Sequence, residues 1–183
     1  MFIQTEDTPN PATMKFLPSR EVMGDGTLEI TDAAGAAASP LAEALFAIEG
    51  VKGVFLGRDF ITVTKGAEKD WPVLKPAILT SIMDHFTNNR PMLSGAGAAE
   101  VAVAHNDTDT VKQIRELIEM KVRPAVAQDG GDIVFENFED GVVYLKLKGS
   151  CSGCPSSTMT LKAGIENMLK HYIPEVREVR QAR

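Results

Sequence analysis

The chain has little cysteine: among 183 residues only Cys151 and Cys154 are present. Two cysteines three positions apart make a poor disulfide framework, and a reducing compartment keeps such a pair as thiols. This scarcity argues against a fold held together by disulfides. It favours a metal or redox site in the run GSCSGCPSS.

The chain also lacks an excess of positive charge and a long apolar run. It carries 25 acidic and 19 basic side chains, a net charge of -6, which disfavours attraction to phosphate backbones. No apolar run approaches the roughly 20 residues that span a bilayer, and the first residues lack the basic and apolar regions of a signal peptide. We therefore expect a soluble, cytoplasmic protein with neither nucleic acid nor membrane as a partner.

The first 88 residues show the periodicities of a small domain. The runs MFIQTE and TMKFL indicate two strands around the turn-rich TPNP, and residues 51–56 and 60–64 indicate a hairpin around GRD. Between them, Ser39 and Pro40 suit the start of a short helix. A closing helix is predicted from 71 to 86, with its regular part starting late because of Pro76.

Residues 89–107 are rich in glycine, alanine and turn formers without a sustained period, which predicts a flexible linker. Residues 108–183 then predict a helix capped by Thr108 or Asp109 and kinked at Pro124, a hairpin around Asp140-Gly141, and a helix after the cysteines. VREV is a candidate last strand. The fold class is α+β: two small domains, each a short, mostly antiparallel sheet packed with helices, joined by a flexible linker.

Alternation and spacing assign faces within residues 108–183. Val143, Leu145 and Leu147 should be buried, while Tyr144, Lys146 and Lys148 should face solvent. The following helix should bury Leu161, Ile165, Met168, Leu169 and Tyr172, and should end before Pro174.

The cysteine loop is expected to lead directly into that helix. Pro155 fits the first helical position, so the unpaired N–H groups of the first turn point toward the sulfurs and favour thiolates. Gly149 and Gly153 give the loop freedom to place both sulfurs inward. Lys146, Lys148 and Lys162 could offset negative charge near a bound metal, although a solvated face explains them equally well.

Counting ligands suggests that one chain is not enough. Two thiolates are half of what a four-thiolate zinc site or an iron-sulfur cluster requires. His171 lies roughly 24 Å along the same expected helix from Pro155, and His85 and His105 are expected to be ordinary surface or linker residues. Two copies related by a two-fold axis would supply four cysteines. A cluster at such a subunit interface would be exposed and easily released, which suits a carrier better than an electron-transfer protein.

Spacing alone leaves other readings open. The pair could be a thiol-disulfide oxidoreductase site, a zinc clasp joining two chains, or an incidental feature of an interaction module. The oxidoreductase is disfavoured because the usual aromatic residue before CxxC is absent. A hairpin also leads in where a βαβ unit is expected.

Two stretches carry a family resemblance. GSCSGCPSSTMTLKAGIE, together with DGGDI at 129–133, closely resembles the C-terminal domain of NifU-like (Nfu-type) iron-sulfur cluster scaffold and carrier proteins. QTEDTPNPATMKFLP and LFAIEGVKGVFLGRDFITVTK are similar to the N-terminal domain of the Nfu subgroup of bacteria and mitochondria. The resemblance covers nearly the whole chain.

The resemblance implies a carrier without enzymatic turnover. A 4Fe-4S cluster would bridge two subunits, with Cys151 and Cys154 as its metal-binding and cofactor-binding residues. The chain would be a homodimer when cluster-bound, with upstream assembly factors and recipient iron-sulfur apoproteins as partners. The extra cysteines of full-length NifU are absent, which argues against cysteine desulfurase partnership and a permanent 2Fe-2S centre.

The implied domains are an N-terminal Nfu-type domain at 1–88, a linker at 89–107 and a C-terminal NifU-like domain at 108–183. TPNP is a candidate client-recognition loop that turn geometry explains equally well. DGGD reads as a helix terminator and strand lead-in, without chemistry. The absence of a visible transit sequence favours a bacterial cytoplasm, with the mitochondrial matrix as the alternative if a transit peptide has been removed.

Overall fold

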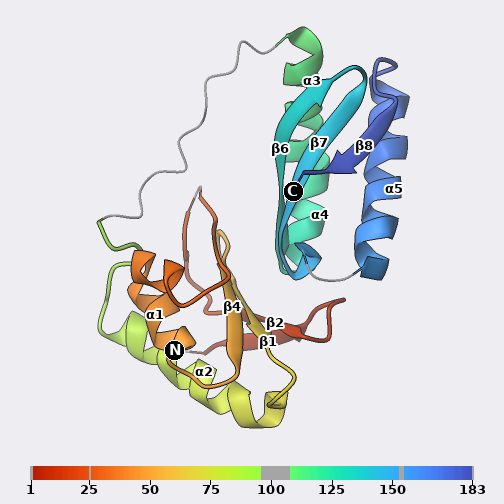
Figure 1. The fold of residues 1–183 in the computed structure, drawn as a ribbon. Coiled ribbons are helices and arrows are strands. Elements are labelled where there is room, and N and C mark those ends of the chain that lie inside the picture. Colours follow the sequence, from red (N-terminus) through yellow and green to blue (C-terminus); the bar gives the residue numbers. More distant parts are fainter. Residues whose placement is uncertain (1, 25, 96–107, 153–154, 183) are drawn as a thin grey trace. The chain divides into compact units, whose positions relative to one another are not determined.

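The computed structural model of the chain describes residues 2–24, 26–95, 108–152 and 155–182. The chain divides into two compact units, residues 1–101 and 102–183. Each unit has its own sheet and helices (Figure 1), and each has its own apolar core. The predicted α+β class is therefore confirmed.

The N-terminal unit is built on a five-stranded antiparallel sheet in the order β1-β2-β5-β4-β3. Its strands are β1 (Gln4–Asp7), β2 (Thr13–Leu17), β3 (Leu28–Ile30), β4 (Val51–Leu56) and β5 (Ile61–Lys65). Its helices are the 3-10 turn η1 (Gly35–Ala38), α1 (Pro40–Phe46) and α2 (Trp71–Thr87). The apolar stripes of α1 and α2 share one core with β2, β4 and β5.

Most N-terminal elements follow the sequence prediction. The Ser39 side chain accepts a hydrogen bond from the Ala42 N–H at 3.4 Å and caps α1, as expected. The late start of α2 is wrong, because Pro76 lies inside a helix that begins at Trp71. Pro76 is exposed while Leu74 and Ile78 are buried on either side of it, so core packing holds the first turns in place. Strand β3 and η1 were not predicted.

The segment after α2 stays with the N-terminal unit. Ser94 donates its backbone N–H to the Ala38 carbonyl at 2.8 Å, and Met92 packs against the core. These residues fall in the stretch 89–107 that the sequence assigned to the linker. Residues 96–107 lie outside the described part of the chain.

The C-terminal unit has a three-stranded sheet in the order β6-β7-β8. In Figure 1 its helices lie along one face of that sheet, and their apolar residues form one core with the strands. The elements are α3 (Asp109–Leu117), the π-helical segment η2 (Ile118–Val122), α4 (Arg123–Gln128), β6 (Gly131–Glu139), β7 (Val142–Gly149), the 3-10 turn η3 (Ser150–Ser152), α5 (Pro155–Tyr172) and β8 (Glu178–Gln181).

The first helix of this unit continues past Pro124, the residue at which the sequence predicted a kink. Thr108 caps α3 by accepting from the Val111 N–H at 3.4 Å, one of the two predicted caps. The π-helical segment η2 then precedes α4, in which Pro124 is the second residue. A proline ring clashes with the carbonyl four residues earlier in a regular helix, and the wider π turn accommodates this conflict.

The predicted hairpin is confirmed, with Asp140 at φ +50° and Gly141 at φ +81° between β6 and β7. The candidate last strand VREV becomes β8, which pairs parallel to β7.

Two side-chain assignments are wrong. Lys148 is 4% exposed instead of facing solvent, and Tyr172 is 50% exposed while its neighbour Ile173 is buried. Among the described residues, no helix combines the length and apolar character that a membrane span requires.

Candidate functional site around Cys151

The cysteine loop joins the end of β7 to the start of α5. Strand β7 ends at Gly149, whose φ of +68° turns the chain into η3, and α5 starts at Pro155 as predicted. The structure therefore places Cys151 at a strand-to-helix junction. Cys154 and Gly153 lie outside the described residues.

The Cys151 side chain is buried, with 7% of its surface exposed, and belongs to the core of the C-terminal unit. Its sulfur lies against Gly131, the first residue of β6. A Cβ atom at position 131 would be 2.7 Å from Cys151 Sγ and 2.8 Å from the Lys148 carbonyl oxygen. Only glycine fits there, so Gly131 determines how deeply this sulfur can sit.

Hydroxyl groups tie the loop to the elements on both sides of it. Ser150 Oγ donates to the Asp129 carbonyl, and the Ser150 N–H donates to the Gly130 carbonyl at 3.3 Å. On the other side, Thr158 Oγ1 of α5 donates to the Cys151 carbonyl at 3.1 Å. The DGGD segment therefore forms the surface against which the cysteine loop packs, a role that the sequence did not indicate.

An ion pair lies beside this contact. Arg123 donates from Nε and Nη2 to the two carboxylate oxygens of Asp132 at 2.8 and 2.9 Å. The same guanidinium donates from Nη1 to Glu119 at 2.8 and 2.9 Å. The hydrogen bonds that Arg123 donates to Asp132 are the main cause that raises the pKa of Arg123, so its charge is permanent. Sequence reasoning missed this pair because nine positions separate its members.

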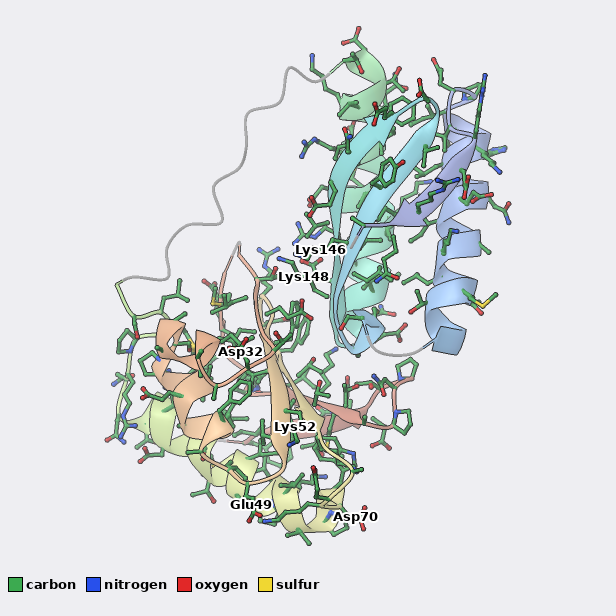
Figure 2. All side chains as sticks on the ribbon, in the orientation of Figure 1. Asp32, Glu49, Lys52, Asp70, Lys146 and Lys148 are labelled. Carbon is green, nitrogen blue, oxygen red and sulfur yellow. The ribbon has the colours of Figure 1, made fainter. Side chains whose placement is uncertain are left out.

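The three lysines proposed to offset charge do not share one face. Lys146 and Lys148 lie on β7, as Figure 2 shows, and strand alternation directs them away from the core face of Leu145 and Leu147. Lys146 is exposed, whereas Lys148 pairs with Asp132 across the β6-β7 ladder. Lys162 instead lies on α5. The lysines thus do not form one positive surface around Cys151.

A small apolar cavity of about 20 Å³ lies between α5 and the sheet, close to the cysteine loop. Thr158 lines this cavity and also donates the hydrogen bond to the Cys151 carbonyl. This cavity is partly open to solvent, and its walls are almost wholly apolar. Its other lining residues are Ile133, Leu145, Leu147, Lys162, Ile165, Val179, Arg180 and Gln181.

The histidines do not gather at this loop. His171 lies in the last turn of α5, far along the helix from Pro155, as expected. His85 is buried in α2 at 1% exposure with both ring nitrogens unpaired, so its assignment as a surface residue is wrong. His105 lies outside the described residues. Within the described ranges, no group of three or more His, Cys, Asp or Glu side chains could hold a metal ion.

Comparison with protein families divides the chain as its fold does. The model described as "Scaffold protein Nfu/NifU N terminal" matches residues 3–89, and the NifU-like domain matches residues 114–180. The first match covers the N-terminal sheet and both of its helices. The second runs from α3 to β8 and contains the cysteine loop.

Curated relatives match nearly the whole chain. A human protein named NFU1 iron-sulfur cluster scaffold homolog, mitochondrial, is 51% identical over 182 residues, which are 99% of this chain and 72% of the relative. Proteins of the same name from Drosophila sechellia and Drosophila simulans are 51% identical over 99% of this chain. The chain spans 65% of the length of these two relatives. The chain therefore belongs to the Nfu/NifU scaffold-protein family.

Two solved structures each match about half of this chain. A solution structure of a NifU-like protein from Saccharomyces cerevisiae is 28% identical, with a TM-score of 0.46, and the match covers 51% of this chain and 85% of that chain. A crystal structure of a Staphylococcus aureus protein is 28% identical, with a TM-score of 0.39, over 45% of this chain and 99% of that chain.

Proposed function

We propose that this protein is an iron-sulfur cluster scaffold and carrier. Its cargo is a labile 4Fe-4S cluster, which Cys151 and Cys154 of two chains bind together and which then passes to recipient apoproteins. The observation that carries the proposal is the match along nearly the whole chain to relatives named iron-sulfur cluster scaffolds. The protein catalyses no substrate turnover of its own.

The chemistry of the loop supports this proposal. A 4Fe-4S cluster takes one thiolate for each iron, and one chain has two cysteines, so two chains supply a complete set. The first-turn N–H groups of α5 favour negative charge at the helix start. The packing of Cys151 against Gly131 and the hydrogen bond from Thr158 to the Cys151 carbonyl preorganise one of the two sulfurs.

Anaerobic reconstitution with iron and sulfide tests the proposal. We expect about four irons per dimer, and Cys151→Ser or Cys154→Ser should abolish loading. Ser152→Ala, which changes the same loop without removing a sulfur, is the matched control and should load normally. Full iron occupancy in a strictly monomeric protein, or a complete cluster in either cysteine variant, would contradict the proposal.

One observation keeps a thiol-disulfide oxidoreductase as the second candidate. Strand β8 pairs parallel to β7, so β7-α5-β8 is itself a βαβ unit, and the hairpin that leads into the loop no longer disfavours this class. The burial of Cys151 weighs against it, because an attacking thiolate needs access to its target. Catalytic reduction of a model disulfide by the metal-free protein would favour this candidate over the carrier.

A zinc clasp between two chains would use the same four sulfurs. Elemental analysis of anaerobically purified protein, together with its visible absorption spectrum, separates the two metals. Iron with broad visible absorption supports the carrier. Zinc in a colourless dimer supports the clasp.

We further propose that residues 1–88 recognise recipient proteins and that residues 108–183 hold the cluster. A fragment of residues 108–183 should then load iron but should transfer the cluster to a recipient more slowly than the whole chain. The word mitochondrial in the names of the relatives supports the mitochondrial matrix as the location. The bacterial cytoplasm stays a prediction from the sequence.

A further inference from the structure

The Arg123-Asp132 ion pair is built to hold one geometry. Both carboxylate oxygens of Asp132 accept from the guanidinium, at 2.8 and 2.9 Å, and 6% of the Asp132 side chain is exposed. Two parallel hydrogen bonds fix the direction as well as the distance of the pair. The carboxylate of Glu119 is 59% exposed and binds the remaining edge of the same guanidinium.

The carboxylate of this pair belongs to the strand that contacts the cysteine. Asp132 directly follows Gly131, whose Cα leaves the space that Cys151 Sγ occupies. The two residues before Gly131 accept hydrogen bonds from Ser150 through their carbonyl groups. Residues 129–131 therefore contact the cysteine loop through their backbone, while the side chain of the next residue, Asp132, is held by α4.

Arg123, the member of the ion pair that lies on a helix, is also held in place. Arg123 is the first residue of α4, directly after the π-helical segment η2, in which Glu119 lies. Val122 and Val126 are buried on either side of Arg123 and anchor this turn in the core. Single π turns inside helices often occur at functional sites, because they redirect one side chain.

We propose that Arg123 and Asp132 are positioning residues for the cluster site. Their ion pair clamps the first residues of β6, and Gly131 transmits this restraint to Cys151 Sγ. The restraint keeps the sulfur buried and correctly directed before iron arrives. Its consequence for cluster loading rests on the proposed function, whereas its effect on the thiol does not.

The test measures the accessibility of Cys151 in metal-free, full-length protein. Cys154→Ser is introduced so that Cys151 is the only thiol, and its alkylation by iodoacetamide is timed at one fixed pH. Asp132→Asn should speed alkylation by about tenfold, because a buried thiol reacts through local opening. The paired change Arg123→Gln with Asp132→Asn removes both charges of the ion pair and should show the same acceleration.

Glu119→Gln is the matched control, because it removes a carboxylate from the same guanidinium without touching β6. It should leave the alkylation rate within about twofold of the parent. The circular dichroism spectrum and thermal midpoint of each variant establish that it is folded. Equal rates in the Asp132→Asn, Glu119→Gln and parent proteins would overturn the proposal. Equal acceleration by both carboxylate changes would also overturn it.

A second readout, with both cysteines present, follows the loss of iron from the reconstituted protein to a chelator. Faster loss in Asp132→Asn than in Glu119→Gln extends the proposal to the loaded state. Accelerated alkylation in a protein that never binds iron would refute the proposed function and leave the positioning role intact. Normal iron binding with unchanged alkylation would refute the positioning role alone.

Discussion

Gly131 is the residue at which side-chain size matters most for the Cys151 environment. Gly131→Ala should destabilise the C-terminal unit by about 1–3 kcal/mol, because the new methyl group would overlap both a sulfur and a backbone oxygen. The backbone oxygen belongs to the β7 ladder and cannot turn aside. The free energy of unfolding from urea titration measures this cost, and the same variant should load less iron.

Gly164→Ala is the matched control for this prediction. Gly164 lies inside α5, and a Cβ atom there would meet nothing within 4 Å. Alanine should therefore stabilise the helix by about 0.5–1 kcal/mol. If both glycine variants changed stability equally, the close approach at Gly131 would not control the packing of Cys151.

His85 gives the N-terminal unit a pH dependence. Burial is the main cause that lowers the pKa of His85 below its ordinary 6.5, and the charge of Arg90 adds to it. As pH falls below 6.5, the unfolded chain binds a proton that the folded chain resists, so stability is lost toward acid. The slope contributed by this one group is at most about 1.4 kcal/mol per pH unit.

Thermal unfolding between pH 5 and 7, monitored through amide exchange in α2, measures this effect. His85→Leu should remove most of the slope below pH 6.5, since leucine has no proton to bind. His171→Leu changes an exposed histidine of the other unit and should leave the slope unchanged. A slope that persisted in His85→Leu would assign the pH dependence to other groups.

At the scale of elements, the turn between β6 and β7 shows what the sequence can predict. Asp140-Gly141 predicted the turn, because both positions require positive φ. It did not predict the pairing at the far end of the hairpin. Glu136 is an extra residue between the pairs Phe135-Leu145 and Asn137-Tyr144, and this bulge shifts the register by one.

The bulge also sets the partner of Gly131, which the sequence assigned, within DGGD, to a helix terminator and strand lead-in. Counting back from the turn without the bulge would place Gly131 opposite Ser150, whereas the structure pairs it with Gly149. The elements were predicted where local signals agree, such as the Ser39 cap and the hairpin turn. They were missed where tertiary packing decides, as in β3, in the first turns of α2 and in η2.

Gly141→Ala should destabilise the C-terminal unit by about 1–3 kcal/mol. Its φ of +81° is unfavourable for alanine, and the added Cβ atom would lie 2.9 Å from Arg177 Cγ and 3.0 Å from the Glu175 carbonyl oxygen. Asp140→Asn is the control, since asparagine also tolerates positive φ and should be nearly neutral. Urea midpoints of the two variants give the comparison, and a neutral Gly141→Ala would contradict the turn geometry.

At the scale of the whole molecule, two separate cores predict two separate folding units. The apolar clusters of residues 14–86 and 114–179 share no member. Fragments of residues 1–95 and 108–183 should each fold and should keep the unfolding midpoint that the same unit shows in the full chain. Urea titration of both fragments and the parent checks this, and a fragment without a cooperative transition would contradict it.

The distribution of tryptophan and tyrosine between the two units allows fluorescence to distinguish them. Trp71, the single tryptophan, donates its Nε1–H to the Pro11 carbonyl at 3.1 Å and so lies next to the TPNP loop. Both tyrosines, Tyr144 and Tyr172, belong to the C-terminal unit. Indole fluorescence excited selectively therefore reports on the N-terminal unit alone. A shift of the tryptophan emission on adding a recipient protein would show docking near that loop. Visible absorbance of the same sample would follow the iron-sulfur cluster at the same time.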